Sequence, residues 1–370
     1  MVLIFAGDWG KIWCSMSMQP GTEKRLHSLD ILRTLAILLV FMFHFSKANE
    51  NSFFGYFGEL GWMGVDLFFV LSGFLIGNQI FSNLQRTGSV SFKNFYLRRG
   101  LRTLPNYLVV LALYLFIPVF RGQLDMPPLW KFLTFTQNFG LRPSAFSHAW
   151  SLCIEEQFYF ILPIIAVFLF SIKSRRSAWM TVFFLVAGGI LLRGWLWNNI
   201  VATADPKTNP GMYVMWIYYP TWGRLDGLLF GVGLAAMRNF ETDLWKRIAA
   251  KGNVSLLLSG LFILVSAFLF IDKSLLSSAL GFPLLSLGLA LLVLSALSEN
   301  SWIHRIRIPG AGLMAMLSYA FYLLHKEIIE LTKLALNFGA FSDSYWLLAG
   351  LSFCMSVVAA AALYLLVERP

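Results

Sequence analysis

The sequence predicts an all-α fold, that of a polytopic integral membrane protein with about ten transmembrane helices and both termini in the cytoplasm. The first observation behind this prediction is composition. Of the 370 residues, 58% are hydrophobic and only 13% are charged, whereas a soluble domain carries about 25% charged residues. The second is that apolar runs as long as a membrane-crossing helix recur from one end of the chain to the other.

The distribution of basic residues is the third observation. The net charge is +10, which by itself would suit a nucleic-acid partner. Most of the lysines and arginines outside the apolar runs, however, lie at the two ends of the chain or in loops after even-numbered spans. That is the positive-inside pattern of membrane proteins, so we expect cytoplasmic termini and no nucleic-acid partner.

The chain divides into an N-terminal cytoplasmic segment, residues 1–25, and a transmembrane domain, residues 26–370. The N-terminal segment lacks the pattern of a signal peptide, and two interpretations stay open: a start at Met18 or an amphipathic segment at the membrane interface. The loop at about 121–147 is aromatic and contains proline, so we expect it on the membrane surface. The spans are expected at about 29–46, 60–82, 103–120, 148–170, 178–198, 213–236, 254–271, 276–297, 312–335 and 345–367.

Three cysteines, Cys14, Cys153 and Cys354, stand far apart in the sequence. They show neither the spacing of a metal site nor that of a disulfide framework, and a free cysteine commonly packs as a small apolar residue. Paired histidines at metal spacing and a glycine-rich nucleotide loop are also missing from the sequence. We therefore expect three packing cysteines and no metal.

Ionisable side chains inside a membrane span are costly, so each is a functional candidate. The first span holds Asp30, Arg33 and His44. Arg33 and His44 are eleven residues apart, which places both on one face of a helix, about 16 Å apart along its axis. We expect His44 in the outer half of the membrane, facing the bundle interior, because its ring is costly to bury in lipid. Asp30 and Arg33 form either an interfacial ion pair or part of a binding site.

The second span contains Asp66, Ser72 and Gly73. Small residues such as Ser72 and Gly73 let helices approach closely, and helix packing is the favoured interpretation of this pair. Asp66 lies near the outer end of the span, where it is either a solvated cap or the partner of a cation such as His44.

Three arginines, Arg98, Arg99 and Arg102, precede the third span at its cytoplasmic end. They form either an ordinary positive-inside cluster, which also attracts anionic lipid, or a clamp for phosphate, which arginine binds with planar bidentate hydrogen bonds. Arg99 and Arg102 are three residues apart and share a face of the helix.

The fourth span runs inward from His148 and carries two adjacent carboxylates, Glu155 and Glu156. Glu155 follows His148 by about two helical turns, so the two share a face at about 10 Å separation. Glu156 points about 100° away. We expect one carboxylate to pair with an arginine and the other to face a site.

Later spans hold further charged and polar groups. Arg224 and Asp226 in the sixth span lie about 200° apart, so we expect each to meet a partner on another span. Tyr322 and His325 in the ninth span share a face, where His325 either binds a ligand or makes an interhelical hydrogen bond. Arg193, near the outer end of the fifth span, is expected to reach outward to the interface.

Together these stretches resemble the membrane-bound acyltransferase-3 family, whose members include O-antigen and exopolysaccharide O-acetyltransferases. The patterns Arg-x10-His, FFxxSG, RRxxR and WSLxxEE are specific in combination. They occur in the order of the family and cover nearly the whole of residues 26–370. The matching stretches are "LDILRTLAILLVFMFHF", "GVDLFFVLSGFLIG", "FYLRRGLRTLPNY", "HAWSLCIEEQFYF", "YYPTWGRLDGLLFG", "LSYAFYLLH" and "LLVERP".

The resemblance implies transfer of an acyl group, usually acetyl from acetyl-CoA, to a hydroxyl of a sugar or related acceptor at a cell envelope, in the cytoplasmic (inner) membrane of a bacterium. Members of the family keep an arginine and a histidine that match Arg33 and His44, and an arginine pair that matches Arg99 and Arg102. Some members carry an additional soluble hydrolase-like domain after the last span. This chain stops at "VERP", so we expect the membrane domain, or a separate partner protein, to complete the reaction.

The chemistry that the resemblance implies assigns the candidate residues to three groups. A sugar hydroxyl needs a general base near neutral pH, and His44 would act either as this base or as a transient acyl carrier. Glu155 would orient the ring of His44, as the acid of a catalytic triad does. The catalytic group is Arg33, His44, Asp66 and Glu155; the acetyl-CoA group is Arg33, Ser72, Gly73, Arg98, Arg99 and Arg102; the acceptor group is His148, Glu156, Arg224, Asp226, Tyr322 and His325.

Two other classes of function stay open. A transporter or flippase that moves an acyl donor or a glycolipid also suits a bundle with charges inside the membrane, although the sequence shows no clear inverted repeat. A scaffold that recruits a synthase would tolerate neutralisation of each charge in the spans. The partners expected from the leading hypothesis are acyl-CoA, a glycan or lipid-linked sugar, and membrane lipid.

Overall fold

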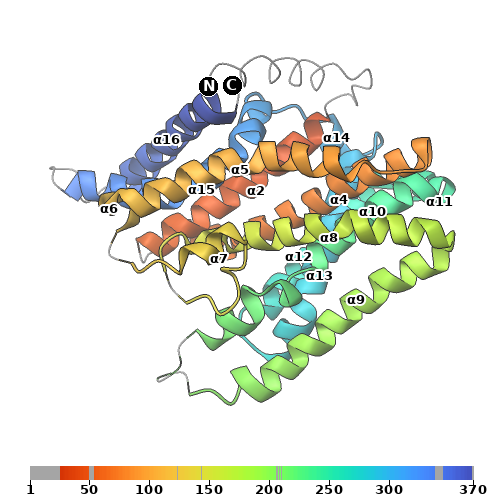
Figure 1. The fold of residues 1–370 in the computed structure, drawn as a ribbon, viewed down its shortest axis with the longest axis horizontal. Coiled ribbons are helices and arrows are strands. Elements are labelled where there is room, and N and C mark those ends of the chain that lie inside the picture. The colour runs from red at the N-terminus through yellow and green to blue at the C-terminus, as the bar shows by residue number, and fades with distance from the viewer. Residues whose placement is uncertain are drawn as a thin grey trace, which may run out of the picture.

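The computed structural model describes residues 26–368 except 50–53, 123, 143, 206, 208, 210 and 338–344. These residues form helices, turns and loops, with no β-strand among them. The interpretations of residues 1–25, and of Cys14 within them, lie outside the described part. Figure 1 shows long helices that run across the molecule, with α6 and α7 near one end and α11 and α14 near the other.

The long helices follow the predicted spans in chain order. They are α2 (His27–Ala48), α4 (Met63–Thr87), α5 (Phe92–Phe116), α8 (Trp150–Ile172), α9 (Arg175–Leu196), α10 (Asp226–Phe240), α12 (Gly252–Leu269), α13 (Phe282–Leu297), α15 (Ala311–Asn337) and α16 (Tyr345–Leu363). The shorter segments are α3 (Gly55–Leu60), α6 (Pro118–Arg121), α7 (Leu129–Leu133), η1 (Ser147–Ala149), η2 (Trp197–Val201), η3 (Val214–Tyr218), η4 (Thr221–Gly223), α11 (Thr242–Ala249), η5 (Ser277–Gly281), α14 (Trp302–Arg305) and η6 (Tyr364–Glu368).

Within the part of the chain that the structure describes, seven helical segments are long and apolar enough to cross a membrane. Each lies on a predicted span, and the chain is an all-helical integral membrane protein, as predicted. The other predicted spans fall on α5, α15 and the region of α10. The helices α5 and α15 have 25 and 27 residues but carry several charges, and α10 has only 15 residues. The seven segments are His27–Ala48, Met63–Thr87, Ser147–Ile172, Arg175–Val201, Gly252–Leu269, Ser277–Leu297 and Tyr345–Glu368.

The prediction of one continuous helix over 213–236 is wrong. This region divides into η3, η4 and α10. The helical backbone ends at Pro220, which is extended with a ψ of 145°, and proline has no N–H to donate to a helical hydrogen bond. Irregular backbone at membrane depth has to be covered by protein. The Asn138 side chain supplies part of this cover by donating a hydrogen bond to the carbonyl oxygen of Tyr219 at 3.2 Å.

The described residues of the loop at 121–147 pack in part on α5, and its place on the membrane surface stays a prediction. Phe132 and Phe146 are buried, and the ring of Phe146 stacks 4.6 Å from that of Tyr114. The hydroxyl of Tyr107 donates to the carbonyl oxygen of Phe132 at 3.1 Å. Two aromatic residues of the loop, Phe132 and Phe146, therefore contact a neighbouring helix, whereas Trp130 is exposed.

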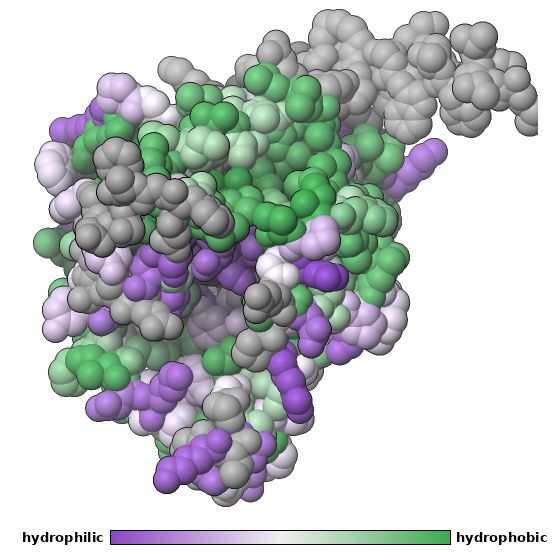
Figure 2. Space-filling model, turned by 90° about the vertical axis from the view of Figure 1, so that its left-hand side faces the viewer, coloured by the Kyte–Doolittle hydropathy of each residue, from purple (hydrophilic) through white to green (hydrophobic). Residues whose placement is uncertain are grey.

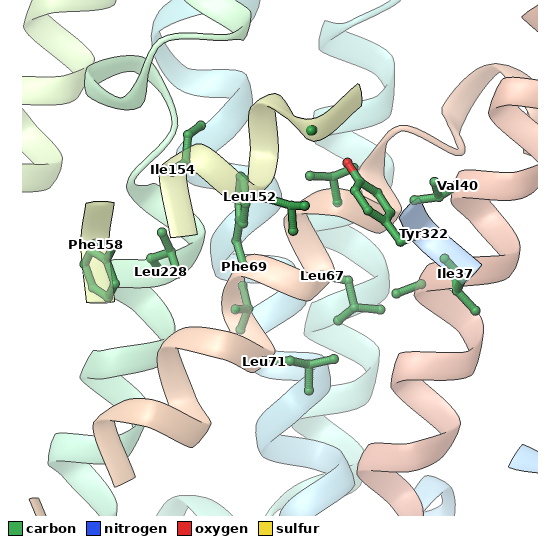
Figure 3. Close-up of a cluster of buried hydrophobic side chains, with 14 of the residues drawn as sticks. Ile37, Val40, Leu67, Phe69, Leu71, Leu152, Ile154, Phe158, Leu228 and Tyr322 are labelled. Carbon is green, nitrogen blue, oxygen red and sulfur yellow. The ribbon is translucent and has the colours of Figure 1, made fainter. Parts of the chain in front are cut away.

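The apolar core lies where α2, α4, α8, α10 and α15 meet, and Figure 3 shows its buried side chains. Ile37 and Val40 from α2, Phe69 from α4, Ile154 from α8 and Leu228 from α10 are each fully buried. Because lipid chains are as apolar as these residues, close packing and hydrogen bonds hold the helices together in a membrane.

Glycines bring α4 and α10 into close contact. A Cβ atom on Gly73 would lie 2.2 Å from the carbonyl oxygen of Leu228, and a Cβ atom on Gly231 would lie 2.2 Å from that of Val70. No side chain fits at such distances, so both positions need glycine. Gly73 therefore serves helix packing, the favoured interpretation of the Ser72 and Gly73 pair.

We expect Gly73→Ala to lower the free energy of unfolding by about 1–3 kcal/mol, because the added methyl group meets backbone that cannot move aside. Thermal unfolding in detergent micelles measures this change. The matched control is Gly260→Ala in α12, where an added Cβ meets nothing within 4 Å; its stability should stay the same or rise slightly. Equal unfolding temperatures for Gly73→Ala and the unchanged protein would contradict the close contact.

Candidate active site

Three histidines from separate parts of the chain meet near the end of α2. His44 lies on α2, His148 in η1 and His325 on α15. The ring centroid of His44 is 4.8 Å from that of His325 and 6.2 Å from that of His148, and the centroids of His148 and His325 are 5.7 Å apart. His148 and His325 are buried, whereas His44 is half-buried. His44 is thus the member of this histidine cluster with the most access from outside.

Hydrogen bonds hold two of these rings in place. The Nε2 atom of His325 lies 3.1 Å from the Nδ1 atom of His44. The Nδ1 atom of His44 also lies 3.0 Å from the carbonyl oxygen of Val40. The Nδ1 atom of His325 lies 2.9 Å and 3.2 Å from the carbonyl oxygens of Tyr322 and Phe321.

Tyr322 connects the histidine cluster to α8. Its hydroxyl donates to the carbonyl oxygen of His148 at 2.6 Å and lies 2.7 Å from the hydroxyl of Ser151. The Nε2 atom of His148 lies 3.2 Å from the carbonyl oxygen of Leu323, and its Nδ1 atom is buried without a hydrogen-bond partner among the described residues.

A polar cavity of about 140 Å³ lies beside the histidine cluster. The helices α2, α4, α5, α8 and α15 all contribute to its wall. Ser151 and Tyr322 line the cavity, and both also belong to the hydrogen-bonded group around His148. Two side chains of the cavity wall therefore belong to the hydrogen-bonded group that reaches the backbone of His148. The predicted site residues that line the cavity are Arg33, Ser72, Arg99, Arg102, Glu155 and Tyr322.

Arg99 is held by two carboxylates at the cavity wall. Its guanidinium lies 3.8 Å from Glu155 and 3.6 Å from Glu156, and 3.9 Å from the ring centroid of Tyr159. The hydroxyl of Ser72 donates to Glu155 at 2.9 Å. Both carboxylates therefore contact the same arginine, and Glu155 also lines the cavity. The sequence predicted one carboxylate for an arginine and the other for a site, so Glu155 combines the two roles.

The remaining arginines differ in their relation to the cavity. Arg33 lines it and lies 4.0 Å from Asp30, which confirms the ion pair between these two residues, whereas their part in a binding site stays a prediction. Arg102 lines the cavity and is exposed. Arg98 is exposed and is not among the cavity-lining residues of the described chain.

The two carboxylates expected near His44 lie elsewhere. Asp66 accepts two hydrogen bonds from Arg224, each of 2.8 Å, and Glu155 lies beside Arg99. Within the described residues, His325 is the side chain that lies within hydrogen-bond distance of His44, at the place where a carboxylate was expected. Helix periodicity tells which residues share a face but not which neighbouring helix that face meets. An interhelical hydrogen bond was one of the two predicted roles of His325, and the structure confirms that bond. Nothing in the sequence signalled that its partner would be His44.

Arg224 and Asp226, predicted to bind the acceptor, are buried in ion pairs around the irregular segment that precedes α10. Arg224 pairs with Asp66, and Asp226 lies 2.7 Å from Arg193. Each thus meets a partner on another helix, as predicted. Arg193 is only 1% exposed, so the prediction that it reaches outward to the interface is wrong. The carboxylate of Asp226 and two backbone carbonyl oxygens accept hydrogen bonds from this guanidinium, so its charge is not left unpaired.

The end of the bundle at which α2 terminates is hollowed. Figure 2 views the molecule from this end and shows hydrophilic residues gathered around a hollow near the middle of the face. The last residue of α2 is Ala48, one helical turn beyond His44. The half-buried imidazole therefore lies near the end of the bundle that carries this hollow.

Metal ligands and reactive cysteines do not contribute to the cluster. Among the residues with described positions, no group of three or more histidines, cysteines or carboxylates is placed to hold a metal ion. Cys153 is buried in α8 and packs as predicted, whereas Cys354 is exposed on α16.

Comparison with known proteins gives a family match over nearly the whole chain. The sequence model of the acyltransferase domain family matches residues 26–365. The peptidoglycan O-acetyltransferase OatA of Listeria monocytogenes is 30% identical over 237 residues, which are 60% of this chain and 35% of that protein. The O-acetyltransferase OatA of Staphylococcus aureus is 25% identical over 330 residues, which are 83% of this chain and 51% of that protein. The chain spans about half the length of these relatives or less. No solved structure matches it.

We expect Arg224→Met to lower the free energy of unfolding by about 3–5 kcal/mol, because Asp66 is then a buried carboxylate without its cation. Equilibrium unfolding in detergent measures the loss. The double variant Arg224→Met with Asp66→Asn should recover part of it, since no unpaired charge remains. As a control, Arg175→Met breaks a pair with Glu241 whose arginine is 71% exposed and should cost at most about 1 kcal/mol. Equal losses at the two pairs would show that burial does not raise the cost of breaking the pair with Asp66.

Proposed function

The chain belongs to the acyltransferase domain family, and we propose that it is an O-acyltransferase that transfers an acetyl group from acetyl-CoA to a hydroxyl of a cell-envelope glycan or lipid-linked sugar. The names of its relatives support this reaction, and that of the Listeria protein supports an acceptor of the peptidoglycan class. The single structural observation that carries the proposal is the polar cavity with arginines in its wall, where Tyr322, another wall residue, donates a hydrogen bond to the backbone of His148.

The orientation that we propose has ten spans and both termini in the cytoplasm. The basic residues around Arg98, Arg99 and Arg102 support it. The seven apolar segments together with α5 and α15, both of which are longer than the roughly 20 residues needed to cross a bilayer, give nine spans. We assign the tenth span to η3, η4 and α10 together. In this orientation the arginines of the cavity lie toward the cytoplasm, where coenzyme A thioesters are available. His44 lies in the outer half of the membrane, nearer to an envelope glycan.

Arg102 and Arg33 are the residues that we assign to the phosphates of the acyl donor. Arg99 is already neutralised by Glu155 and Glu156, so it organises the wall of the cavity more than it offers free charge. Arg102 is exposed at the cavity and can form bidentate hydrogen bonds to a phosphate. A cavity of about 140 Å³ is too small for the nucleotide head, and we propose that it takes only the narrow end of the pantetheine arm, with the thioester directed toward the histidines.

His44 supplies the chemistry in this proposal. A sugar hydroxyl attacks a thioester slowly unless its proton is removed, and a neutral imidazole is the usual general base near neutral pH. His44 is half-buried while the other two histidines are buried, so it is the ring that an acceptor can reach. The alternative route, in which His44 first carries the acetyl group itself, uses the same position of the ring.

We expect His44→Ala to lower transfer by about 100- to 10,000-fold, the usual contribution of a general base, while the protein still folds. Thiol release from acetyl-CoA by the purified protein, with peptidoglycan fragments as acceptors, measures it. Transfer at the normal rate by the folded variant would rule out the assigned chemistry. Vesicle uptake of donor or glycolipid without consumption of acetyl-CoA would favour a transporter instead.

We expect Arg102→Met to raise the KM for acetyl-CoA by about 10- to 100-fold, because a hydrogen bond to a charged group contributes about 1.5–3 kcal/mol. The kcat should change much less, since Arg102 is far from the reacting carbonyl. Steady-state kinetics with varied acetyl-CoA measure both constants. Arg98→Met, one helical turn away and outside the cavity, is the matched comparison and should have the smaller effect. A larger rise in the KM for Arg98→Met than for Arg102→Met would show that the donor enters along another face of α5.

A further inference from the structure

The contact between His44 and His325 determines where the protons of both rings lie. A neutral imidazole carries one N–H and one lone pair. The Nδ1 atom of His325 lies 2.9 Å from the carbonyl oxygen of Tyr322 and 3.2 Å from that of Phe321. Carbonyl oxygens only accept hydrogen bonds. Nδ1 of His325 must therefore carry the hydrogen, and its Nε2 atom holds the lone pair.

The same reasoning assigns the proton of His44. Its Nδ1 atom faces two acceptors, which are the lone pair on Nε2 of His325 at 3.1 Å and the carbonyl oxygen of Val40 at 3.0 Å. Nδ1 of His44 therefore carries the hydrogen and shares it between the two. Its Nε2 atom keeps a lone pair and makes no hydrogen bond to any described residue. This lone pair belongs to the half-buried member of the cluster.

We propose that His325 is a positioning residue that holds His44 in the Nδ1–H tautomer, so that Nε2 of His44 is the nitrogen that reacts. The inference rests on the proposed transfer reaction and deepens it. It assigns to a neutral imidazole the part that a carboxylate plays in a Ser-His-Asp triad. A neutral partner suits a buried site in a membrane bundle, because a second charge there would need its own cation.

His148 completes the cluster without joining this pair. Its Nε2 atom lies 3.2 Å from the carbonyl oxygen of Leu323 and so carries the hydrogen. No hydrogen bond connects it to either of the other two rings within the described chain. His44 and His325 therefore form a hydrogen-bonded pair in which the tautomer of each ring is fixed, and His148 lies outside this pair.

The proton balance of the transfer step follows from this assignment. Nε2 of His44 accepts the proton of the acceptor hydroxyl as that oxygen bonds to the carbonyl carbon of the thioester. The imidazolium that results keeps its Nδ1–H on the lone pair of His325, and this charge-assisted hydrogen bond stabilises it. When the carbon–sulfur bond breaks, the proton on Nε2 passes to the thiolate, which leaves as the free thiol. His44 is then neutral again, and His325 has neither gained nor lost a proton.

Nitrogen-15 NMR of the full chain with labelled histidine, reconstituted in lipid nanodiscs, tests the tautomers without any assay of activity. We expect neutral Nδ1–H tautomers for both His44 and His325, and a coupling across the N–H···N hydrogen bond between them. The chain has five histidines, so the variants His44→Asn and His325→Gln assign the signals by subtraction. An Nε2–H tautomer at either ring in the unchanged protein would overturn the proposal.

Kinetics of three variants test the positioning role. His325→Phe keeps a ring but removes the acceptor, so we expect kcat to fall by about 10- to 100-fold with the KM for acetyl-CoA unchanged. His325→Gln places an amide oxygen near the former Nε2 atom and should restore most of the loss. The control His304→Phe changes a histidine at the other end of the bundle, on α14, and should keep full activity.

The outcomes separate this inference from the proposed function. A normal kcat for His325→Phe, or an equal loss for His325→Phe and His325→Gln with both proteins folded, would overturn the positioning role. If the unchanged protein releases no thiol from acetyl-CoA with any acceptor, the proposed function fails. The tautomers measured by NMR would then still show whether His325 orients His44.

Discussion

The ion pair between Arg224 and Asp66 connects the irregular segment before α10 to the start of α4, and the arrangement of the bundle depends on it. Inside a bilayer, backbone that leaves the helical conformation must be covered by protein, and an unpaired charge costs several kcal/mol. The helix that begins near Asp66 presents Gly73 to α10 and Ser72 to Glu155. One buried pair therefore helps to set both the contact between α4 and α10 and a wall of the polar cavity.

Polar and apolar contacts are interleaved in this bundle, and Tyr322 shows how. Its ring lies among the buried hydrophobic side chains of the core in Figure 3, while its hydroxyl binds Ser151 and the carbonyl oxygen of His148. Tyrosine suits such a position because one end is apolar and the other needs a hydrogen-bond partner. The aromatic ring packs between the helices. Tyr322 also lines the cavity, and its hydroxyl connects the cavity wall to the backbone of His148.

Sequence reasoning was most successful where it concerned one helix at a time. The faces that it assigned to Arg33, Arg99 and Arg102 meet in one cavity, because helical periodicity is a local property. It did not identify the partners between helices: Asp66 pairs with a cation, which was one of its two predicted roles, but that cation is Arg224 and not His44. The break in the sixth span had a local signal in Pro220, whose restriction of the backbone outweighs the apolar character of the surrounding residues.

The sequence by itself determined the helical membrane fold and the family, because apolar runs of bilayer length and ordered motifs are formed by residues that are close together in the chain. It also determined that charges inside the spans need partners. Only the tertiary structure decided which partners they have. The tautomer of His44, and with it the nitrogen that is free to react, depends on His325, which follows it by 281 positions in the chain. Hydrogen bonds act over about 3 Å, so their partners are known only once the helices are packed.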